Sequence, residues 1–320
     1  SSDVCSSDLH EALAGGPLNS PSAALDWVSE QLQRVELALQ RWLPADAPAG
    51  LGEAMRYAVL DGGKRLRPLL VLAARRAVAQ GQADSALDEA ALRAACAIEL
   101  IHAYSLVHDD MPCMDNDVLR RGKPTVHIQF GQAQALLAGD ALQALAFEVL
   151  TPQPSPIPDA LQGRLCAILA RAAGHAGMAG GQAIDLASVG LQLDEATLRQ
   201  MHRMKTGALL EASVDLGAAC GQASDESLLC LGEYGRAIGV AFQVIDDVLD
   251  VTADSATLGK TAGKDAANDK PTYVSLMGLE RSRQYADELM KTALTALQRS
   301  GLQHTQALHD LAWQVVGRRH

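Results

Sequence analysis

Apolar residues recur at intervals of three and four along nearly the whole chain, and this pattern restricts it to a helical fold. Leu25, Val28, Leu32, Val35 and Leu39 begin the pattern and would lie on one face of a helix. The pattern is interrupted only by short segments rich in Gly, Pro and polar residues. No segment shows the strict alternation that is typical of a half-buried strand.

We expect further helices at residues 52–60, 68–80, 88–109, 131–150, 160–173, 176–190, 194–220, 225–252, 272–298 and 304–316. The chain is rich in Ala and Leu, and aromatic residues make up only 3% of it, which favours helix over sheet. Its 320 residues contain no repeat of fixed period and no change in composition that would mark a domain boundary. We therefore expect an all-α fold, a single bundle of about ten helices over residues 24–320. The Ser- and Asp-rich start predicts a disordered tail at residues 1–23.

Charge and cysteine usage exclude several classes of protein. The chain carries 27 basic and 38 acidic residues, a net charge of −11, which argues against a nucleic-acid partner. No apolar run approaches the roughly 20 uncharged residues of a membrane-spanning helix, and no signal peptide is visible. The six cysteines are scattered without a CxxC pair, which favours reduced thiols and a cytoplasmic location.

Two Asp-rich segments, SLVHDDMPCMDND and GVAFQVIDDVLDVT, each end an apolar helical window. Their aspartates are Asp109, Asp110, Asp115 and Asp117 in the first segment and Asp246, Asp247 and Asp250 in the second. In the second segment the outer two are four residues apart, so they share a helical face and repel each other. A divalent cation would relieve this repulsion, and carboxylate oxygens favour Mg²⁺. A single acidic run is usually a solvated surface, but two runs that each follow an apolar turn favour a metal site.

The first segment needs a bend to act as a metal site. Asp109 and Asp115 are six residues apart and would not align on a straight helix. Pro112 breaks the helix between them. The sequence therefore predicts a bulge that brings Asp115 back beside Asp109.

Basic residues accompany both acidic segments. Mg²⁺ held by few carboxylates usually shares its coordination with substrate phosphates. The loop GGKRLRP at residues 62–68 offers backbone amides and three cations at the start of a helix, which suits an anion. Arg120 and Arg121 would either bind phosphate or neutralise the nearby carboxylates, and Lys205 lies inside an apolar helix. Lysines also follow the second segment, at Lys260, Lys264 and Lys270. This doubled arrangement predicts a ligand with several phosphate charges and a hydrocarbon part.

The chain resembles the trans-type isoprenyl diphosphate synthases, most closely the bacterial farnesyl diphosphate synthases. The resemblance covers about residues 25–316 and rests on GGKRLRP at 62–68, HDDMPCMDNDVLRRGKPT at 108–125, GGQAIDL at 180–186, MHRMKTG at 201–207 and GVAFQVIDDVLD at 239–250. It implies a helical bundle around a deep apolar cavity and a homodimer. It also implies condensation of isopentenyl diphosphate with dimethylallyl or geranyl diphosphate, with about three Mg²⁺ ions per site bridged to the diphosphate.

The resemblance also assigns roles to individual residues. The metal ligands would be Asp109, Asp110, Asp115, Asp246, Asp247 and Asp250, on two segments that face each other. The allylic diphosphate would be held by Arg120, Lys205 and Lys260, and isopentenyl diphosphate by Lys64, Arg67, His102 and Arg121, with Gly63 in the same loop. Oxygens near the developing carbocation would come from Thr206 and Gln243, and Lys270 aligns with a lysine of a closing loop.

Product length is expected to depend on the helix before the first Asp segment. The floor of the chain tunnel would be formed by Ile101, Tyr104 and Ser105, and an aromatic residue at Tyr104 favours a fifteen-carbon product. The alternatives are a geranylgeranyl or longer-chain synthase of the same fold, or a non-catalytic subunit of a heteromeric synthase. We interpret His108 as a hydrogen-bonding neighbour of Asp109 rather than a base.

Overall fold

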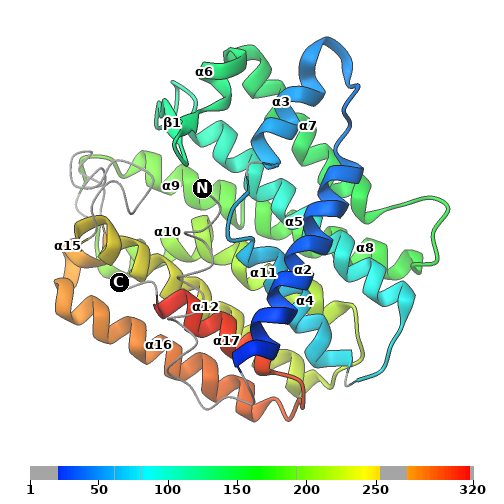
Figure 1. Ribbon diagram of the computed structural model, residues 1–320. Helices are drawn as coiled ribbons and strands as arrows, with labels where there is room; N and C mark the ends of the chain where they lie inside the picture. The colour runs from blue at the N-terminus through cyan, green and yellow to red at the C-terminus, as the bar shows by residue number, and fades with distance from the viewer. Residues whose placement is uncertain (1–20, 61, 80, 192, 253–271, 318–320) are drawn as a thin grey trace.

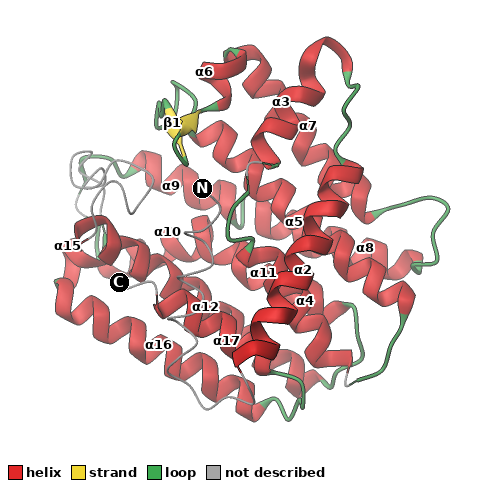
Figure 2. Cartoon of the chain, viewed as in Figure 1, coloured by secondary structure: helices red, strands yellow, loops and turns green. Residues whose placement is uncertain are grey.

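The computed structural model describes residues 21–60, 62–79, 81–191, 193–252 and 272–317. Within these ranges nearly all of the regular structure is helical, which confirms the all-α expectation (Figure 2). The first half contains α2 (Pro21–Trp42), the short η1 (Pro48–Gly50), α3 (Leu51–Val59), α4 (Leu66–Ala79), α5 (Ser85–Asp109), α6 (Val126–Phe130), α7 (Gln132–Leu150) and α8 (Asp159–Ala173). The second half contains α9 (Met178–Ala187), α10 (Glu195–His202), a π-helical turn η2 (Arg203–Gly207), α11 (Ala208–Ala219), α12 (Asp225–Thr252), α15 (Tyr273–Met277), α16 (Leu279–Arg299) and α17 (Gln306–Val316).

Several local features differ from the sequence expectation. The window at 272–298 is not one helix, because Gly278, at φ 82°, divides it into α15 and α16. Residues 21–23 of the expected tail belong to α2, and the rest of that tail lies outside the described residues. The short helix α6 was not predicted, and the window at 194–220 is divided by η2 rather than continuous. A small hairpin, β1 (Leu119–Arg120) and β2 (Lys123–Pro124), pairs antiparallel where no strand was expected. Its two central residues, Arg121 at φ 53° and Gly122 at φ 77°, have the positive φ angles of a tight hairpin turn. Strands of two residues are too short to show an alternating pattern.

The buried side chains form two clusters that share a central pair of helices. One cluster draws on α3, α5, α7 and α8, and the other on α12, α16 and α17. Both include residues of α4 and α11, which lie at the middle of the bundle in Figure 1. Their backbones approach closely, because a Cβ added at Gly217 of α11 would lie 2.0 Å from the carbonyl oxygen of Val71 on α4. The central pair therefore connects the two halves of the core.

Three helices of the described chain, α5, α7 and α12, are long and apolar enough to cross a membrane by length and composition alone. In the fold, 72% of the most apolar window of α5, 61% of that of α12 and 39% of that of α7 is buried inside the protein. Helix α7 therefore leaves much of its apolar surface outside the core.

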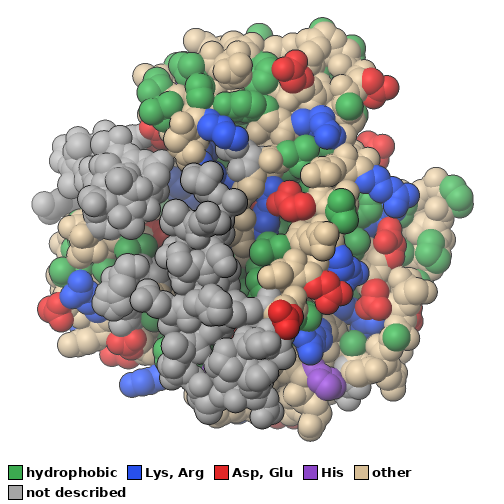
Figure 3. Space-filling model, viewed as in Figure 1, with side chains coloured by type: hydrophobic (Ala, Val, Ile, Leu, Met, Phe, Trp, Pro, Cys, Tyr) green, Lys and Arg blue, Asp and Glu red, His purple; other side chains and the backbone are tan. Residues whose placement is uncertain are grey.

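Charged side chains of both signs are interspersed over the described part of the face shown in Figure 3. No broad basic area is visible there. This distribution agrees with the acidic balance of the sequence.

Candidate active site

The first Asp segment folds back on the end of α5. Helix α5 ends at Asp109, and the backbone N–H of Asp115 donates to the carbonyl oxygen of Asp109 at 2.9 Å. The N–H of Asp117 likewise donates to the carbonyl of Asp110 at 3.1 Å, and Asn116 has a φ of 50°. The predicted bulge is confirmed, since the turn returns Asp115 to the helix end.

Asp109 lies in a crowded electrostatic environment. Burial raises the pKa of this carboxyl to about 6, the charges of Asp115 and Asp110 add to the effect, and Lys205 and Arg120 oppose it. The Asp109 carboxylate is therefore close to a second acid and to two cations from other parts of the chain. A hard divalent cation would lower the cost of keeping the acids ionised, so these residues fit Mg²⁺ in the chemistry of their oxygen donors.

Arg120 and Arg121 have different partners. Arg120, carried by β1, forms a two-pronged pair with Asp110, with Nε 2.8 Å from Oδ2 and Nη2 2.5 Å from Oδ1. Asp110 is only 2% exposed, so this pair fixes the hairpin against the end of α5. Arg121 instead donates to the carbonyl oxygen of Gly62 at 2.5 Å. Of the two roles that the sequence left open, Arg120 neutralises a neighbouring carboxylate in this state.

The basic loop and Arg121 come together around His102. Gly63 has a φ of 130°, which favours glycine, and a Cβ added there would lie 2.9 Å from Nη1 of Arg121. Burial, together with the charges of Arg67 and Arg121, lowers the pKa of His102 well below its ordinary value. The His102 ring is therefore neutral among guanidinium groups, and Lys64 is exposed at the loop surface. These positions form a basic wall, and the acids Glu99 and Glu36 act on Arg121 from behind it.

Arg65 does not belong to this wall, although the sequence counted it among three cations of the loop. It is 4% exposed, and its guanidinium lies 2.7 Å from Glu36 and 2.8 Å from Glu99. It also donates to the carbonyl oxygen of Val59 at 2.7 Å. Its φ of 46° lies in the left-handed region, so these bonds hold a strained backbone that sets the direction of the loop.

The second Asp segment lies near the end of α12, where its members differ in their surroundings. Asp246 is half-buried, whereas Asp247 is 1% exposed and Asp250 is 3% exposed. The Oδ1 atom of Asp247 accepts from Nε2 of Gln243 at 2.8 Å, and its Oδ2 accepts from the backbone N–H of Tyr273 at 2.8 Å. Asp247 thus holds Gln243 and the start of α15 in place, and Asp246 is the more accessible carboxylate.

The π-helical turn η2 connects the two acidic segments. Its Lys205 lies 2.6 Å from Oδ2 of Asp185 on α9, and the hydroxyl of Thr206 donates to Oε1 of Gln243 on α12 at 2.9 Å. Helix α9 approaches so closely that a Cβ at Gly181 would lie 2.1 Å from the nitrogen of Lys205. Because Lys205 also acts on the pKa of Asp109, the turn lies between the ends of α5 and α12.

Other predicted positions lie along α5 or outside the described residues. The half-buried ring of Tyr104 makes an edge contact with His108 at 5.6 Å between centroids, and the hydroxyl of Ser105 donates to the carbonyl of His102 at 2.8 Å. Nε2 of His108 lies 3.1 Å from the carbonyl oxygen of Leu136, so this ring joins α5 to α7, and its hydrogen-bond partner is Leu136 rather than the expected Asp109. Lysines Lys260 and Lys270 lie outside the described residues.

The sequence analysis quoted Asp185 and Gly181 within the motif GGQAIDL but gave neither of them a role. A signal for Asp185 was present, because a lysine inside an apolar helix requires either solvent or an acid partner. Among the described residues, no group of three or more His, Cys, Asp and Glu side chains gathers closely enough to hold a metal alone.

Known proteins with similar sequences are prenyl diphosphate synthases. A Polyprenyl synthetase family profile matches residues 48–311. A probable farnesyl diphosphate synthase of Bradyrhizobium diazoefficiens is 51% identical over 281 residues, covering 85% of this chain and 81% of the relative. The large subunit 1 of a heterodimeric geranylgeranyl pyrophosphate synthase from Arabidopsis thaliana chloroplasts is 46% identical over 282 residues. The match covers 86% of this chain and 74% of the relative.

A solved structure extends the likeness to three dimensions. The geranyltransferase of Helicobacter pylori, determined in complex with magnesium and isoprenyl diphosphate, superposes with a TM-score of 0.76 at 34% identity. The match covers 94% of this chain and 97% of that one. With the paired acidic segments and the basic loop in the places described, the chain belongs to the polyprenyl synthetase family.

Proposed function

We propose that the chain is a Mg²⁺-dependent prenyltransferase that condenses isopentenyl diphosphate with dimethylallyl or geranyl diphosphate to give farnesyl diphosphate. The observation that carries this proposal is the pairing of two unlike anion sites. One combines Asp109 and Asp115 with Lys205, and the other places the guanidinium groups of Arg67 and Arg121 around His102. The first suits a diphosphate bound through metal ions, and the second suits a diphosphate bound by protein cations alone.

The two sites suit two different substrates. The allylic diphosphate, which must lose its diphosphate group, belongs at the acidic site, where Mg²⁺ held by Asp109, Asp115 and Asp246 would offset the charge of the leaving group. Isopentenyl diphosphate keeps its diphosphate, so the basic wall with Lys64 and Arg67 is sufficient for it.

The chain's own residues would favour ionisation and exclude competing reactions. Lys205, fixed by Asp185 at 2.6 Å, would place a positive charge beside the departing diphosphate. The oxygens of Thr206 and Gln243, fixed to each other at 2.9 Å, would lie near the carbocation. The allylic C–O bond breaks first and gives this cation and free diphosphate. The C=C bond of isopentenyl diphosphate then attacks the cation to form a C–C bond, and the resulting cation loses a proton to the diphosphate and forms a new double bond. Positioning supplies much of the acceleration, since the nucleophile is only a double bond.

The product is proposed to have fifteen carbons. The half-buried Tyr104, five residues before Asp109, supports this length, because its ring would block a longer chain that ran along α5. The bacterial relative is named a probable farnesyl diphosphate synthase, but the plant relative is part of a geranylgeranyl pyrophosphate synthase. A twenty-carbon product is therefore the second candidate.

Product analysis tests this function. Purified protein is incubated with Mg²⁺, isopentenyl diphosphate and either dimethylallyl or geranyl diphosphate, and the products are separated by chain length. We expect a fifteen-carbon diphosphate that disappears with a chelator, and longer products from Tyr104→Ala. A twenty-carbon product from the unaltered chain would preserve the mechanism and refute the role of Tyr104. No condensation by folded protein would favour a non-catalytic subunit.

We also propose a cytoplasmic homodimer, formed through α6 and α7. Three large apolar side chains on these helices are more than two-fifths exposed, namely Ile128 at 51%, Leu136 at 47% and Leu137 at 52%. A second copy of the chain would cover them. Leu137→Asp should shift the mass measured by light scattering from dimer to monomer, whereas Leu229→Asp, at a 73% exposed position on α12, should not.

All cysteines of the described chain are free, which supports a reducing compartment such as the cytoplasm.

A further inference from the structure

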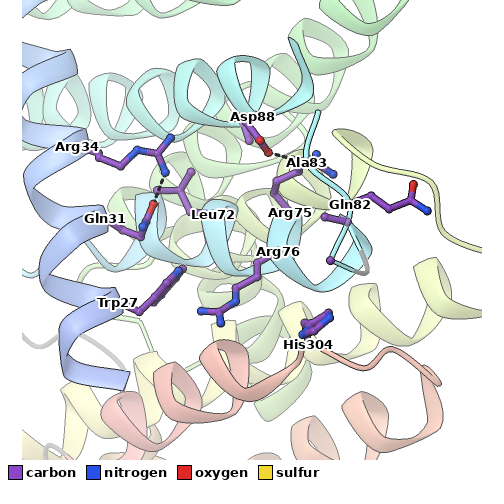
Figure 4. Close-up of a pocket in the computed structure, with 13 residues that line it drawn as sticks. Trp27, Gln31, Arg34, Leu72, Arg75, Arg76, Gln82, Ala83, Asp88 and His304 are labelled. Carbon is purple, nitrogen blue, oxygen red and sulfur yellow. Dashed lines mark hydrogen bonds and ion pairs between the residues drawn. The ribbon is translucent and has the colours of Figure 1, made fainter. Parts of the chain in front are cut away.

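A cavity lies at the ends of α4 and α5 that are far from the candidate active site. It has a volume of about 410 Å³ and is lined by α2, the end of α4, the start of α5 and His304, two residues before the start of α17 (Figure 4). Along α5, Asp88 in the cavity wall is 21 residues from Asp109, which corresponds to about 32 Å at 1.5 Å per residue. The cavity is large enough for a small organic ligand.

The wall of this cavity is basic in a protein that is acidic overall. Three arginines, Arg34, Arg75 and Arg76, line it together with His304, against the single carboxylate of Asp88. The whole chain has a net charge of −11. Arg75 is buried in this wall, whereas Arg34 and Arg76 are exposed at it.

Arg75 provides the second observation that points to a ligand. It is 5% exposed, and its Nε donates to Oδ1 of Asp88 at 3.0 Å. Its Nη2 atom is buried and has no hydrogen-bond partner. A buried guanidinium with an unmet donor is unfavourable, and an anionic oxygen at the floor of the cavity would meet it.

The other cations are held in place around this floor. The guanidinium of Arg76 lies over the ring of Trp27, 5.6 Å from its centroid, and has no acidic partner among the described residues. Nη1 of Arg34 donates to Oε1 of Gln31 at 2.6 Å. These contacts use only part of each guanidinium, so the remaining N–H groups are available and already oriented. Figure 4 shows them on α2 and α4, on facing sides of the hollow.

We propose that this cavity is a second binding site for a small polyanion that carries phosphate groups. Guanidinium groups bind phosphate oxygens in pairs, and three of them with one histidine match several phosphate charges better than a single carboxylate. A volume of about 410 Å³ suits a small molecule. The site is separate from the one that we propose for the prenyl diphosphates, so a test of phosphate binding here does not depend on whether the proposed reaction is correct.

Trp27 allows this site to be observed by itself. The chain has three tryptophans, so Trp42→Phe with Trp313→Phe leaves only Trp27 as a fluorophore. Inorganic triphosphate is titrated into this protein in the presence of a chelator and at constant ionic strength. We expect a saturable change in Trp27 emission with triphosphate and a clearly weaker response to citrate. No saturable change would overturn the proposal, and an equal response to citrate would overturn the assignment to phosphate.

Variants of the wall locate the binding. In the Trp27-only protein, Arg76→Gln and Arg75→Gln should each weaken triphosphate binding about tenfold or more, as expected for loss of a charged hydrogen bond. The exposed Arg171→Gln on α8 removes the same charge elsewhere and should leave binding unchanged. Equal weakening by all three would show a general charge effect and overturn the site. If the Trp27-only protein does not fold, calorimetric titration of triphosphate into the chain with all its tryptophans tests the proposal instead. The double variant Arg34→Gln with Arg76→Gln should then lose one class of triphosphate-binding sites that the unaltered chain has.

Discussion

Replacing Arg65 with methionine tests the claim that this residue supports the basic loop rather than the substrate. Arg65 is 4% exposed and joins Glu36, Glu99 and the Val59 carbonyl at 2.7–2.8 Å. In Arg65→Met, Glu99, itself 4% exposed, loses its cation and remains buried. The strained φ of 46° also loses the bonds that hold it.

The expected loss follows from the burial of the two partners. Removing one member of a buried ion pair costs about 3–5 kcal/mol, because the other charge is left uncompensated. The side chain of Glu36 is 31% exposed, so the loss of its ion pair with Arg65 contributes little to the fall in stability. We therefore expect the free energy of unfolding to fall by about 3–5 kcal/mol. The KM for isopentenyl diphosphate should also rise, since Lys64 and Arg67 are on the same loop.

Urea unfolding followed by circular dichroism measures this loss, at a fixed protein concentration because a dimer unfolds with a concentration-dependent midpoint. The double variant Arg65→Met with Glu99→Leu is the control. It replaces the pair by apolar side chains and should recover most of the stability. A loss below about 1 kcal/mol in the single variant, or a double variant as unstable as the single one, would refute the reasoning.

Two further predictions concern the π-helical turn and its neighbours. Burial lowers the pKa of His202 from 6.5 to about 4. Its stabilising contribution is complete above pH 6.5 and is lost as the pH falls toward 4, because the unfolded state then binds the additional proton. His202→Phe, which keeps the ring stacked on Tyr273, should therefore lose about 3 kcal/mol less stability than the unaltered chain between pH 7 and 4, measured by urea unfolding. Gly181→Ala would place a Cβ 2.1 Å from the nitrogen of Lys205 and should lower kcat about tenfold to a hundredfold in the condensation assay. Gly163→Ala on α8, where nothing lies within 4 Å, should leave kcat unchanged, and equal effects of the two changes would contradict the role of Gly181.

Most of the fold was predictable because helical periodicity extends over long windows. The windows at 131–150 and 225–252 match α7 and α12 within one residue. The failures share a physical cause, since α6 has five residues and each strand of the hairpin has two. Such short elements depend on tertiary contacts, here the pair between Arg120 and Asp110, rather than on a local pattern.

The site was predictable where a single residue dictates local geometry. Pro112 was sufficient to predict the return of Asp115, because proline ends a helix wherever it occurs in the interior. The partner of a charged residue depends on tertiary structure, so the sequence could not show that Arg65 turns inward to Glu99. For the same reason Asp185 was not connected to Lys205, twenty residues away in the chain and on another helix.

The π-helical turn has a consequence for the angular phase of the helices on either side of it. Each residue advances an α-helix by about 100°, so one residue too many in a turn rotates everything that follows by that angle. Helix α11 therefore turns a different set of its side chains toward the core than it would if α10 continued into it as a regular α-helix. Deleting one residue between Arg203 and Gly207 would restore regular winding, but it would put either Lys205 or all of α11 out of phase. The extra residue of the turn thus lets Lys205 face the candidate active site while the apolar side chains of α11 face the core.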